Sequence, residues 1–286
     1  MPASTPRRSE LALRATTTLS VPLRRRRFSY SLGVGVGAQY TRSVDRVGPA
    51  SDLDALLSRC PPGVTRPQAT MLVLDWGYVG HEAYRDSVSP ERGVTSFVRL
   101  RVGDERAFSD VDVAEVYVDV DAFSSGPGLP NHVVAACLSG GATFDDRPGA
   151  LFVAGGLVGR DLLQDVLGGQ RGAPGALRGF PGAHLVGDAL AAATLESRLP
   201  LWKTERGVDT LPLFAQRLHD GAFVDTATAF DERSLASMTF ATGVGGALRL
   251  QLLLGYYGTF VARAGAARGL TSGGIEQGYV VLGASS

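Results

Sequence analysis

The sequence has no long hydrophobic run, no net charge and almost no cysteine, and each shortage excludes a class of protein. No apolar stretch approaches the roughly 20 residues that a membrane-spanning helix needs. The 28 basic and 28 acidic side chains cancel, so the chain lacks the positive field that would attract a nucleic acid partner. Two cysteines, Cys60 and Cys137, are too few for a disulfide framework, and we expect both to be free thiols.

Two adjacent segments near the N-terminus alternate apolar residues with small or polar ones. The first runs from Leu11 to Leu23 with its mostly apolar set at odd positions, and the second runs from Phe28 to Tyr40 with its apolar set at even positions. A period of two places each apolar set on one face of an extended strand. A membrane-spanning β-strand needs roughly 9–11 residues, with lipid on one side and water on the other. The pattern therefore predicts strands of the outer-membrane type.

Similar segments recur along the whole chain. We count about eleven strands, which is more than a compact sandwich requires. They span residues 11–23, 28–40, 68–78, 94–102, 113–123, 132–143, 190–201, 214–227, 238–254, 259–267 and 276–283. Short and long connections alternate, as in outer-membrane barrels, although Val79–Arg92 is long for its expected side. The expected fold class is all-β, an antiparallel transmembrane β-barrel that forms a single domain over residues 1–286.

Four motifs follow one another in the C-terminal hundred residues. They are LRGFP at 177–181, LESRLPL at 195–201, GAFVD at 221–225 and GVGGALR at 243–249. In this order and spacing they resemble the bacterial surface antigen family, the BamA-like outer-membrane assembly-factor superfamily. The match covers about residue 177 to the C-terminus, and the upstream strands are similar only in their alternation.

This resemblance implies a sixteen-stranded barrel in which residues 144–187 form a long extracellular loop that folds into the lumen. The tip of the loop would carry Arg178, Gly179 and Phe180. By family order five strands follow the loop, as five do here, whereas about six precede it here. We therefore expect an incomplete barrel, its C-terminal part with about 11 of 16 strands, from a fragment or a miscalled start. The missing parts would be the N-terminal strands and the periplasmic domains of family members.

Arg178 is the residue with the clearest specific role. An arginine inside a lumen and close to the barrel wall favours a carboxylate that it binds with two hydrogen bonds. Asp225 lies on the lumen-facing phase of its strand, and the resemblance implies that it meets Arg178. Glu196 is a competing partner, and a solvated loop arginine without a fixed partner is the alternative. Gly179 would let the loop tip turn sharply, and Phe180 would pack against the wall.

The sequence contains no motif that supports an enzyme. Gly33-x-Gly35-x-Gly37 imitates a dinucleotide-binding loop, but it lies inside an expected strand. The pair His81-Glu82 begins a zinc-protease motif that lacks its second histidine. No Gly-x-Ser-x-Gly occurs, and the four histidines are scattered along the chain. We expect no catalytic residue, no metal and no cofactor.

Three functions remain open. The favoured one is a surface-antigen-type protein of the bacterial outer membrane, which inserts or translocates other outer-membrane proteins or anchors a missing N-terminal domain. Its partners would be outer-membrane lipid and client outer-membrane proteins. The first alternative is a passive pore for small solutes, selected by charges in the lumen. The second is a soluble all-β binding protein whose apolar faces pack on another sheet.

Overall fold

The computed structural model describes most of the chain. The described residues are 7–25, 28–46, 69–82, 89–106, 109, 112–126, 129–144, 152–156, 177–182, 184–207, 213–230, 238–254 and 258–284. Cys60 and residues 145–151, 157–176 and 183 of the expected loop lie outside this set. Among the described residues, no helix has the length and apolar character needed to cross a membrane.

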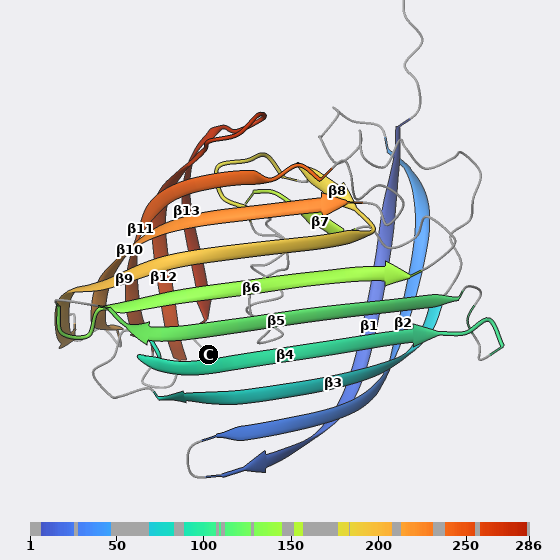
Figure 1. The fold of residues 1–286 in the computed structure, drawn as a ribbon, viewed down its shortest axis with the longest axis horizontal. Coiled ribbons are helices and arrows are strands. Elements are labelled where there is room, and N and C mark those ends of the chain that lie inside the picture. Colours follow the sequence, from blue (N-terminus) through green and yellow to red (C-terminus); the bar gives the residue numbers. More distant parts are fainter. Residues whose placement is uncertain are drawn as a thin grey trace, which may run out of the picture.

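Antiparallel β-strands account for the fold (Figure 1). Eleven strands form one sheet in the order β1-β2-β3-β4-β5-β6-β9-β10-β11-β12-β13, and β7 and β8 form a second, two-stranded sheet. The bounds are β1 Arg7–Arg24, β2 Ser29–Arg46, β3 Ala69–Glu82, β4 Arg92–Gly103, β5 Val113–Ser125, β6 Val133–Phe144, β7 Phe152–Ala154, β8 Leu185–Gly187, β9 Ala189–Gly207, β10 Leu213–Phe230, β11 Ala241–Leu254, β12 Gly258–Gly269 and β13 Glu276–Ala284. The expected all-β antiparallel fold is confirmed.

The large sheet is strongly curved and does not close (Figure 1). Strands β1 and β13 form its two edges, and no pairing joins them in the described part of the chain. Neighbours in the sheet are also neighbours in sequence, except where β9 follows β6. The structure is therefore a barrel-like sheet of eleven strands with an open seam, as the strand count from the sequence predicts.

One connection is shorter than the sequence indicates. The expected strand ended at Tyr78, which left Val79–Arg92 as a long connection. In the structure β3 continues to Glu82, and Glu82 pairs with Arg92 at the start of β4. A hydrogen bond of 3.0 Å between His81 Nδ1 and Thr95 Oγ1 adds to this pairing. This end of the ladder contains Gly80 and Gly93, whose lack of side chains hides the alternation that predicts strands.

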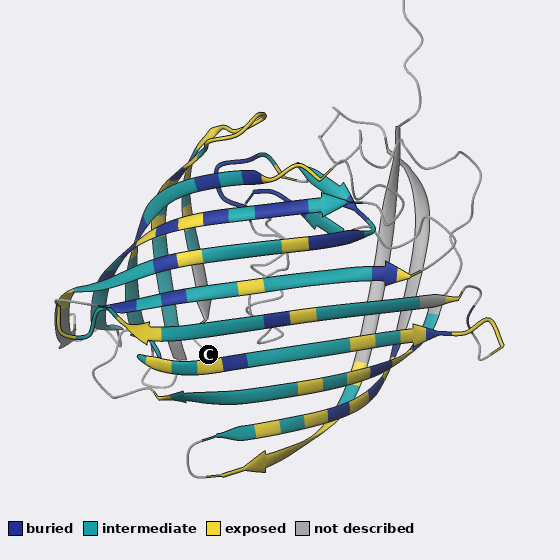
Figure 2. Ribbon diagram, in the orientation of Figure 1, coloured by how far each residue is buried: buried dark blue, intermediate teal, exposed yellow. Residues whose placement is uncertain are grey.

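Buried, intermediate and exposed residues alternate along the strands of the large sheet (Figure 2). Its two faces have opposite character. On the convex face, Leu19, Leu32 and Val280 are 80%, 58% and 77% exposed. On the concave face, the charged side chains of Glu196 and Asp225 are buried, at 4% and 1% exposed. A soluble protein distributes these residue types the other way round, with charges outside and large aliphatic side chains inside.

The short strands β7 and β8 pack against the concave face at one end of β9 and β10. A small apolar core holds them there and also includes the turn that precedes β8. Its buried members are Ala154, Leu177, Phe180, Leu190, Ala227 and Ala241. The described pieces of the expected 144–187 loop therefore lie on the inner side of the curved sheet.

Candidate functional site

A tight turn at residues 177–180 brings Arg178 to the concave face. Gly179 has a φ of 85°, a left-handed conformation that glycine adopts without steric cost. A Cβ at Gly179 would also lie 2.5 Å from backbone atoms of Arg268 and Gly269 at the end of β12. Both the conformation and the close approach thus require glycine in the middle of this turn.

Backbone contacts fasten the turn to the segment around the start of β13. The Gly179 N–H donates to Gln277 Oε1 at 3.2 Å, and the Gly179 carbonyl accepts from the Ile275 N–H at 2.8 Å. On β11, a Cβ at Gly243 would collide with the carbonyl oxygen of Arg178, and on β12 a Cβ at Gly269 would collide with the carbonyl oxygen of Gly179. The turn therefore fits into a space that glycines of β11 and β12 leave open.

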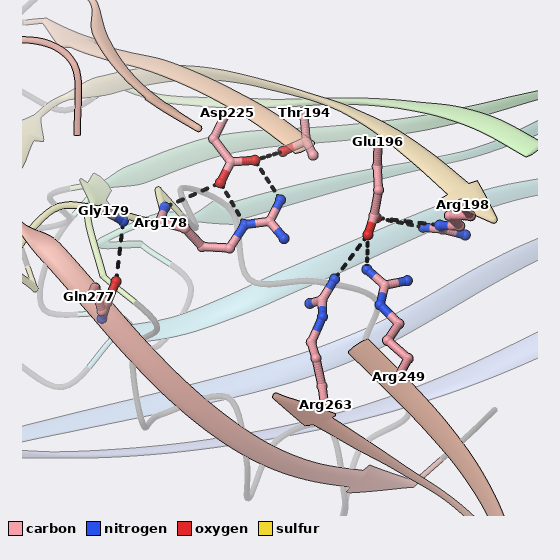
Figure 3. Close-up of polar contacts among 9 residues, drawn as sticks. All are labelled: Arg178, Gly179, Thr194, Glu196, Arg198, Asp225, Arg249, Arg263 and Gln277. Carbon is pink, nitrogen blue, oxygen red and sulfur yellow. Dashed lines mark hydrogen bonds and ion pairs between the residues drawn. The ribbon is translucent and has the colours of Figure 1, made fainter. Parts of the chain in front are cut away.

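Arg178 binds Asp225 on β10 with both forks of its guanidinium (Figure 3). Its Nε donates to Oδ2 and its Nη2 donates to Oδ1, each at 2.6 Å. The Arg178 backbone N–H donates to Oδ2 at 3.2 Å, and Thr194 Oγ1 on β9 donates to Oδ1 at 2.9 Å. The Asp225 carboxylate thus accepts four hydrogen bonds, which is the coordination that makes a buried charge tolerable.

An aromatic ring completes the surroundings of Arg178. The Cζ atom of its guanidinium lies 3.2 Å from the centre of the Phe223 ring, a cation–π contact from the same strand as Asp225. Burial lowers the pKa of Arg178, but the hydrogen bonds and the charge of Asp225 outweigh burial, and the net pKa is raised. Arg178 therefore stays charged. A desolvated cation–π contact such as the one with Phe223 contributes about 2 kcal/mol of stabilisation.

Phe180 anchors the far side of the same turn. It is among the most deeply buried side chains of the described residues, and its ring lies 4.8 Å from that of His184. Leu177, at the start of the turn, is equally buried in the small core. In the Arg-Gly-Phe motif, Arg178 thus forms the ion pair, Gly179 allows the tight turn and Phe180 packs in the apolar core.

Glu196, the other acid singled out in the sequence, faces a different set of arginines (Figure 3). Arg198 on the same strand donates from Nη2 to Oε2 at 3.1 Å. Arg249 on β11 and Arg263 on β12 both donate to Oε1, the latter at 3.2 Å. We call these four residues the arginine cluster. The carboxylate therefore joins three strands across the concave wall and is not the partner of Arg178.

A glycine on β10 allows this long reach. Glu196 belongs to β9, so its side chain must cross β10 to meet Arg249 and Arg263. A Cβ at Gly221 on β10 would lie 2.8 Å from Glu196 Oε1. Any larger residue at Gly221 would displace the carboxylate from the arginines.

The opposite part of the concave wall, β3–β6, carries charges that pair locally. Arg99 binds Asp75 through two hydrogen bonds of 2.7 Å and 2.8 Å, and Arg101 Nη1 binds Glu115 Oε2 at 2.8 Å. Each of these pairs joins residues that face one another in neighbouring strands. They are cross-strand side-chain pairs of the kind that stabilises sheets.

Three potential metal ligands also converge on β5 and β6. The carboxylates of Asp119 and Asp121 and the thiol of Cys137, a free cysteine, have ligand atoms within 4.8 Å of one another. Tyr117 donates its hydroxyl hydrogen to Asp119 Oδ2 at 3.1 Å. No sequence motif indicates this group, because Cys137 becomes a neighbour of Asp121 only through the strand register.

The structure thus brings together Arg178, Gly179, Phe180 and Asp225, whereas Glu196 lies in a separate cluster. Sequence reasoning missed Thr194 and Phe223 as partners of this site. Both residues lie on the same face of the sheet as Asp225, and the alternation of their strands is the sequence pattern that indicates this shared face. The sequence matches no protein-family model and no curated protein.

Proposed function

We propose that this chain is a β-barrel protein of the bacterial outer membrane, of the surface-antigen type. It inserts or translocates other outer-membrane proteins, or it anchors a further domain in the membrane. The observation that carries the proposal is the inverted distribution of side chains. Large aliphatic residues are exposed over the convex face, and charged residues are buried on the concave face.

The energetics of the convex face favour lipid as its surroundings. Exposed apolar surface in water costs about 25 cal/mol per Å² relative to burial, and soluble monomers rarely expose large contiguous apolar patches. In this protein, exposed apolar residues occur on most strands of the eleven-stranded sheet. They include Leu23, Val36, Leu72, Trp76, Val102, Leu138, Leu195, Leu201 and Leu248. A second sheet packed on this face would be needed in a soluble sandwich, and the described residues form no such sheet.

The Arg-Gly-Phe turn supports the assignment to the surface-antigen type. The sequence resemblance implies that Arg178 meets a carboxylate on the wall. In the structure, Arg178 forms a bidentate ion pair with Asp225. A passive pore has no need to tie a turn so firmly to its inner wall. The turn therefore favours a protein with a regulated or obstructed interior.

Unpaired edges add a requirement to this proposal. Strands β1 and β13 each present backbone N–H and C=O groups without partners in the described sheet. In hydrocarbon each such group costs several kcal/mol, so lipid-embedded sheets close on themselves. We therefore propose that further strands, from the same polypeptide or another, pair with these two edges in the membrane.

Adjacent residues on opposite faces of β6 allow a direct test of membrane embedding. Leu138 is 57% exposed on the convex face, and Ser139 points to the concave face opposite Asp119. In lipid, Leu138→Arg costs about 2–4 kcal/mol at the membrane midplane. Ser139→Arg is the matched control, with the same new side chain on the other face.

The measurement is the free energy of unfolding of the chain refolded into phospholipid vesicles together with the strands that close its sheet. We expect Leu138→Arg to lower it by the amount above and to reduce the folded fraction, while Ser139→Arg changes it by less than about 1 kcal/mol. In a soluble protein the exposed Leu138 would tolerate arginine. Equal, small effects of both substitutions would therefore overturn membrane embedding.

A separate assay distinguishes insertion from anchoring. Vesicles with and without this protein are mixed with an unfolded outer-membrane barrel protein, and protease protection reports the rate of its insertion. We expect faster insertion with the protein present. An unchanged rate would assign the chain to anchoring, and a large single-channel conductance without insertion would assign it to a passive pore.

A further inference from the structure

The arginine cluster holds more positive than negative charge. Arg198, Arg249 and Arg263 share the single carboxylate of Glu196, which leaves two positive charges without a matching acid in the cluster. Asp225 cannot supply the difference, because its two oxygens already bind Arg178 and Thr194. The side chains are largely withdrawn from solvent, with Arg249 12% and Arg263 25% exposed.

Unused polar atoms surround the same cluster. The Nε atoms of Arg249 and Arg263 and the Nδ1 atom of His219 are buried without a hydrogen-bond partner in the described part of the chain. His219 is 6% exposed and faces Arg249 directly across the β10–β11 ladder. Buried polar groups are almost always hydrogen-bonded, so these atoms have hydrogen-bonding capacity for a bound ligand.

Tyr279 approaches the cluster from the other side. Its hydroxyl is also buried and unpartnered among the described residues. A Cβ at Gly265 on β12 would lie 2.7 Å from this hydroxyl, so the tyrosine leans over a glycine toward β11, as Glu196 leans over Gly221 from β9. Glycines on β10 and β12 thus leave room on the concave face for side chains that reach across from β9 and β13.

We propose that the arginine cluster binds a small oxyanion of the phosphate type on the concave face. Planar guanidinium groups match the geometry of such anions, and two uncompensated, partly buried charges favour a ligand with two negative charges. Glu196 neutralises only one of the three arginines, so it competes with the ligand for their positive charge. The site lies on the face opposite the exposed aliphatic residues, so the anion is a dissolved one and not a lipid headgroup.

This proposal stands apart from the membrane function. It depends on the charge of the cluster and holds equally for an inserting protein, an anchor or a pore. Its failure would leave the Leu138 and Ser139 comparison untouched, and the reverse is also true.

Inorganic phosphate is the probe. The full chain, folded in a non-ionic detergent without phosphate, is titrated by isothermal calorimetry, and folding of every variant is checked by heat-modifiable migration on gels. We expect Arg263→Gln to weaken phosphate binding about tenfold or more, since it removes a charge-assisted contact. Arg268→Gln, an exposed arginine on the same strand, is the matched control and should leave binding unchanged.

Glu196→Gln gives the sharper result, because its expected effect has the opposite sign. Removing the carboxylate leaves the three arginines uncompensated, so phosphate should bind several-fold more tightly. A purely structural role of Glu196 would only weaken binding. Weaker binding by Glu196→Gln, or equal binding by all variants including Arg263→Gln, overturns the proposal.

A second titration identifies the source of the phosphate group. A short-chain phosphatidic acid, dissolved below its micellar concentration, carries the same headgroup on a lipid. We expect it to bind more weakly than inorganic phosphate, because the exposed aliphatic residues that could contact its chains lie on the opposite, convex face. Tighter binding of the lipid that Arg263→Gln abolishes would overturn the assignment to a dissolved anion.

Discussion

Two arginine–aspartate pairs on the concave face have almost the same geometry and very different surroundings. Arg178–Asp225 and Arg99–Asp75 are both bidentate, and both arginines lie near a phenylalanine ring. The first pair joins a turn to the wall, and its side chains are only 7% and 2% exposed. The second joins neighbouring strands that already share a backbone ladder, and its side chains are 16% and 14% exposed.

The difference teaches that geometry alone does not set the importance of an ion pair. Losing Asp225 would leave a buried guanidinium without compensation and would free the turn. Losing Asp75 would leave Arg99 with access to water and would leave β3 and β4 hydrogen-bonded to each other. Substitutions at the two pairs would test this difference.

Asp225→Ala should have the largest effect. It leaves Arg178 buried and unpaired, which costs about 3–5 kcal/mol of the free energy of unfolding. The measurement is urea unfolding of the chain in lipid vesicles. A second readout is trypsin cleavage after Arg178, which is buried in the wild type and should become accessible in the variant.

The exchange of charges checks that pairing itself is responsible. Arg178→Asp and Asp225→Arg should each free the turn at residues 177–180, so that chymotrypsin cleaves after Leu177, which is buried in the wild type. The double variant should recover part of the lost stability and of the protection. Failure of the double variant to improve on either single variant would mean that the two residues act independently, and the contrast drawn above would be lost.

Asp75→Ala should have the smallest effect, a loss of about 1 kcal/mol in the same unfolding measurement. Trypsin cleavage after Arg178 should be unchanged, because Asp75 pairs with Arg99 on the opposite part of the wall. A loss as large as that of Asp225→Ala would show that local pairs on the wall matter as much as the pair that fastens the turn.

The sequence was sufficient for much of this structure, because alternation is a local property. Within β2, Gly33, Gly35 and Gly37 are buried and Leu32, Val34 and Val36 are exposed, which the period of two predicts directly. The same rule put Asp225 on the concave face. Its partner Arg178 lies in a turn without periodicity and came from the resemblance.

The parts that were not predictable depend on register. Which residues of β9, β11 and β12 face each other is fixed by the lengths of the connections and by backbone pairing, which no local pattern records. Alternation therefore places Glu196 on the concave face but does not indicate its partners on other strands. Two of these partners, Arg249 and Arg263, are opposite one another in the β11–β12 ladder.

The strict alternation of the two faces also limits how the sheet can assemble. If β2 shifted by a single position against β3, Asp75 would no longer face Gly33 and the chain would have to turn one strand over to keep its pairing. If β3 were the strand turned over, Asp75 would then point to the convex face, and Leu72 and Leu74 would point to the concave face. Misaligned intermediates are therefore heavily penalised, and the correct pairing of each new strand is enforced by its neighbours as the sheet grows.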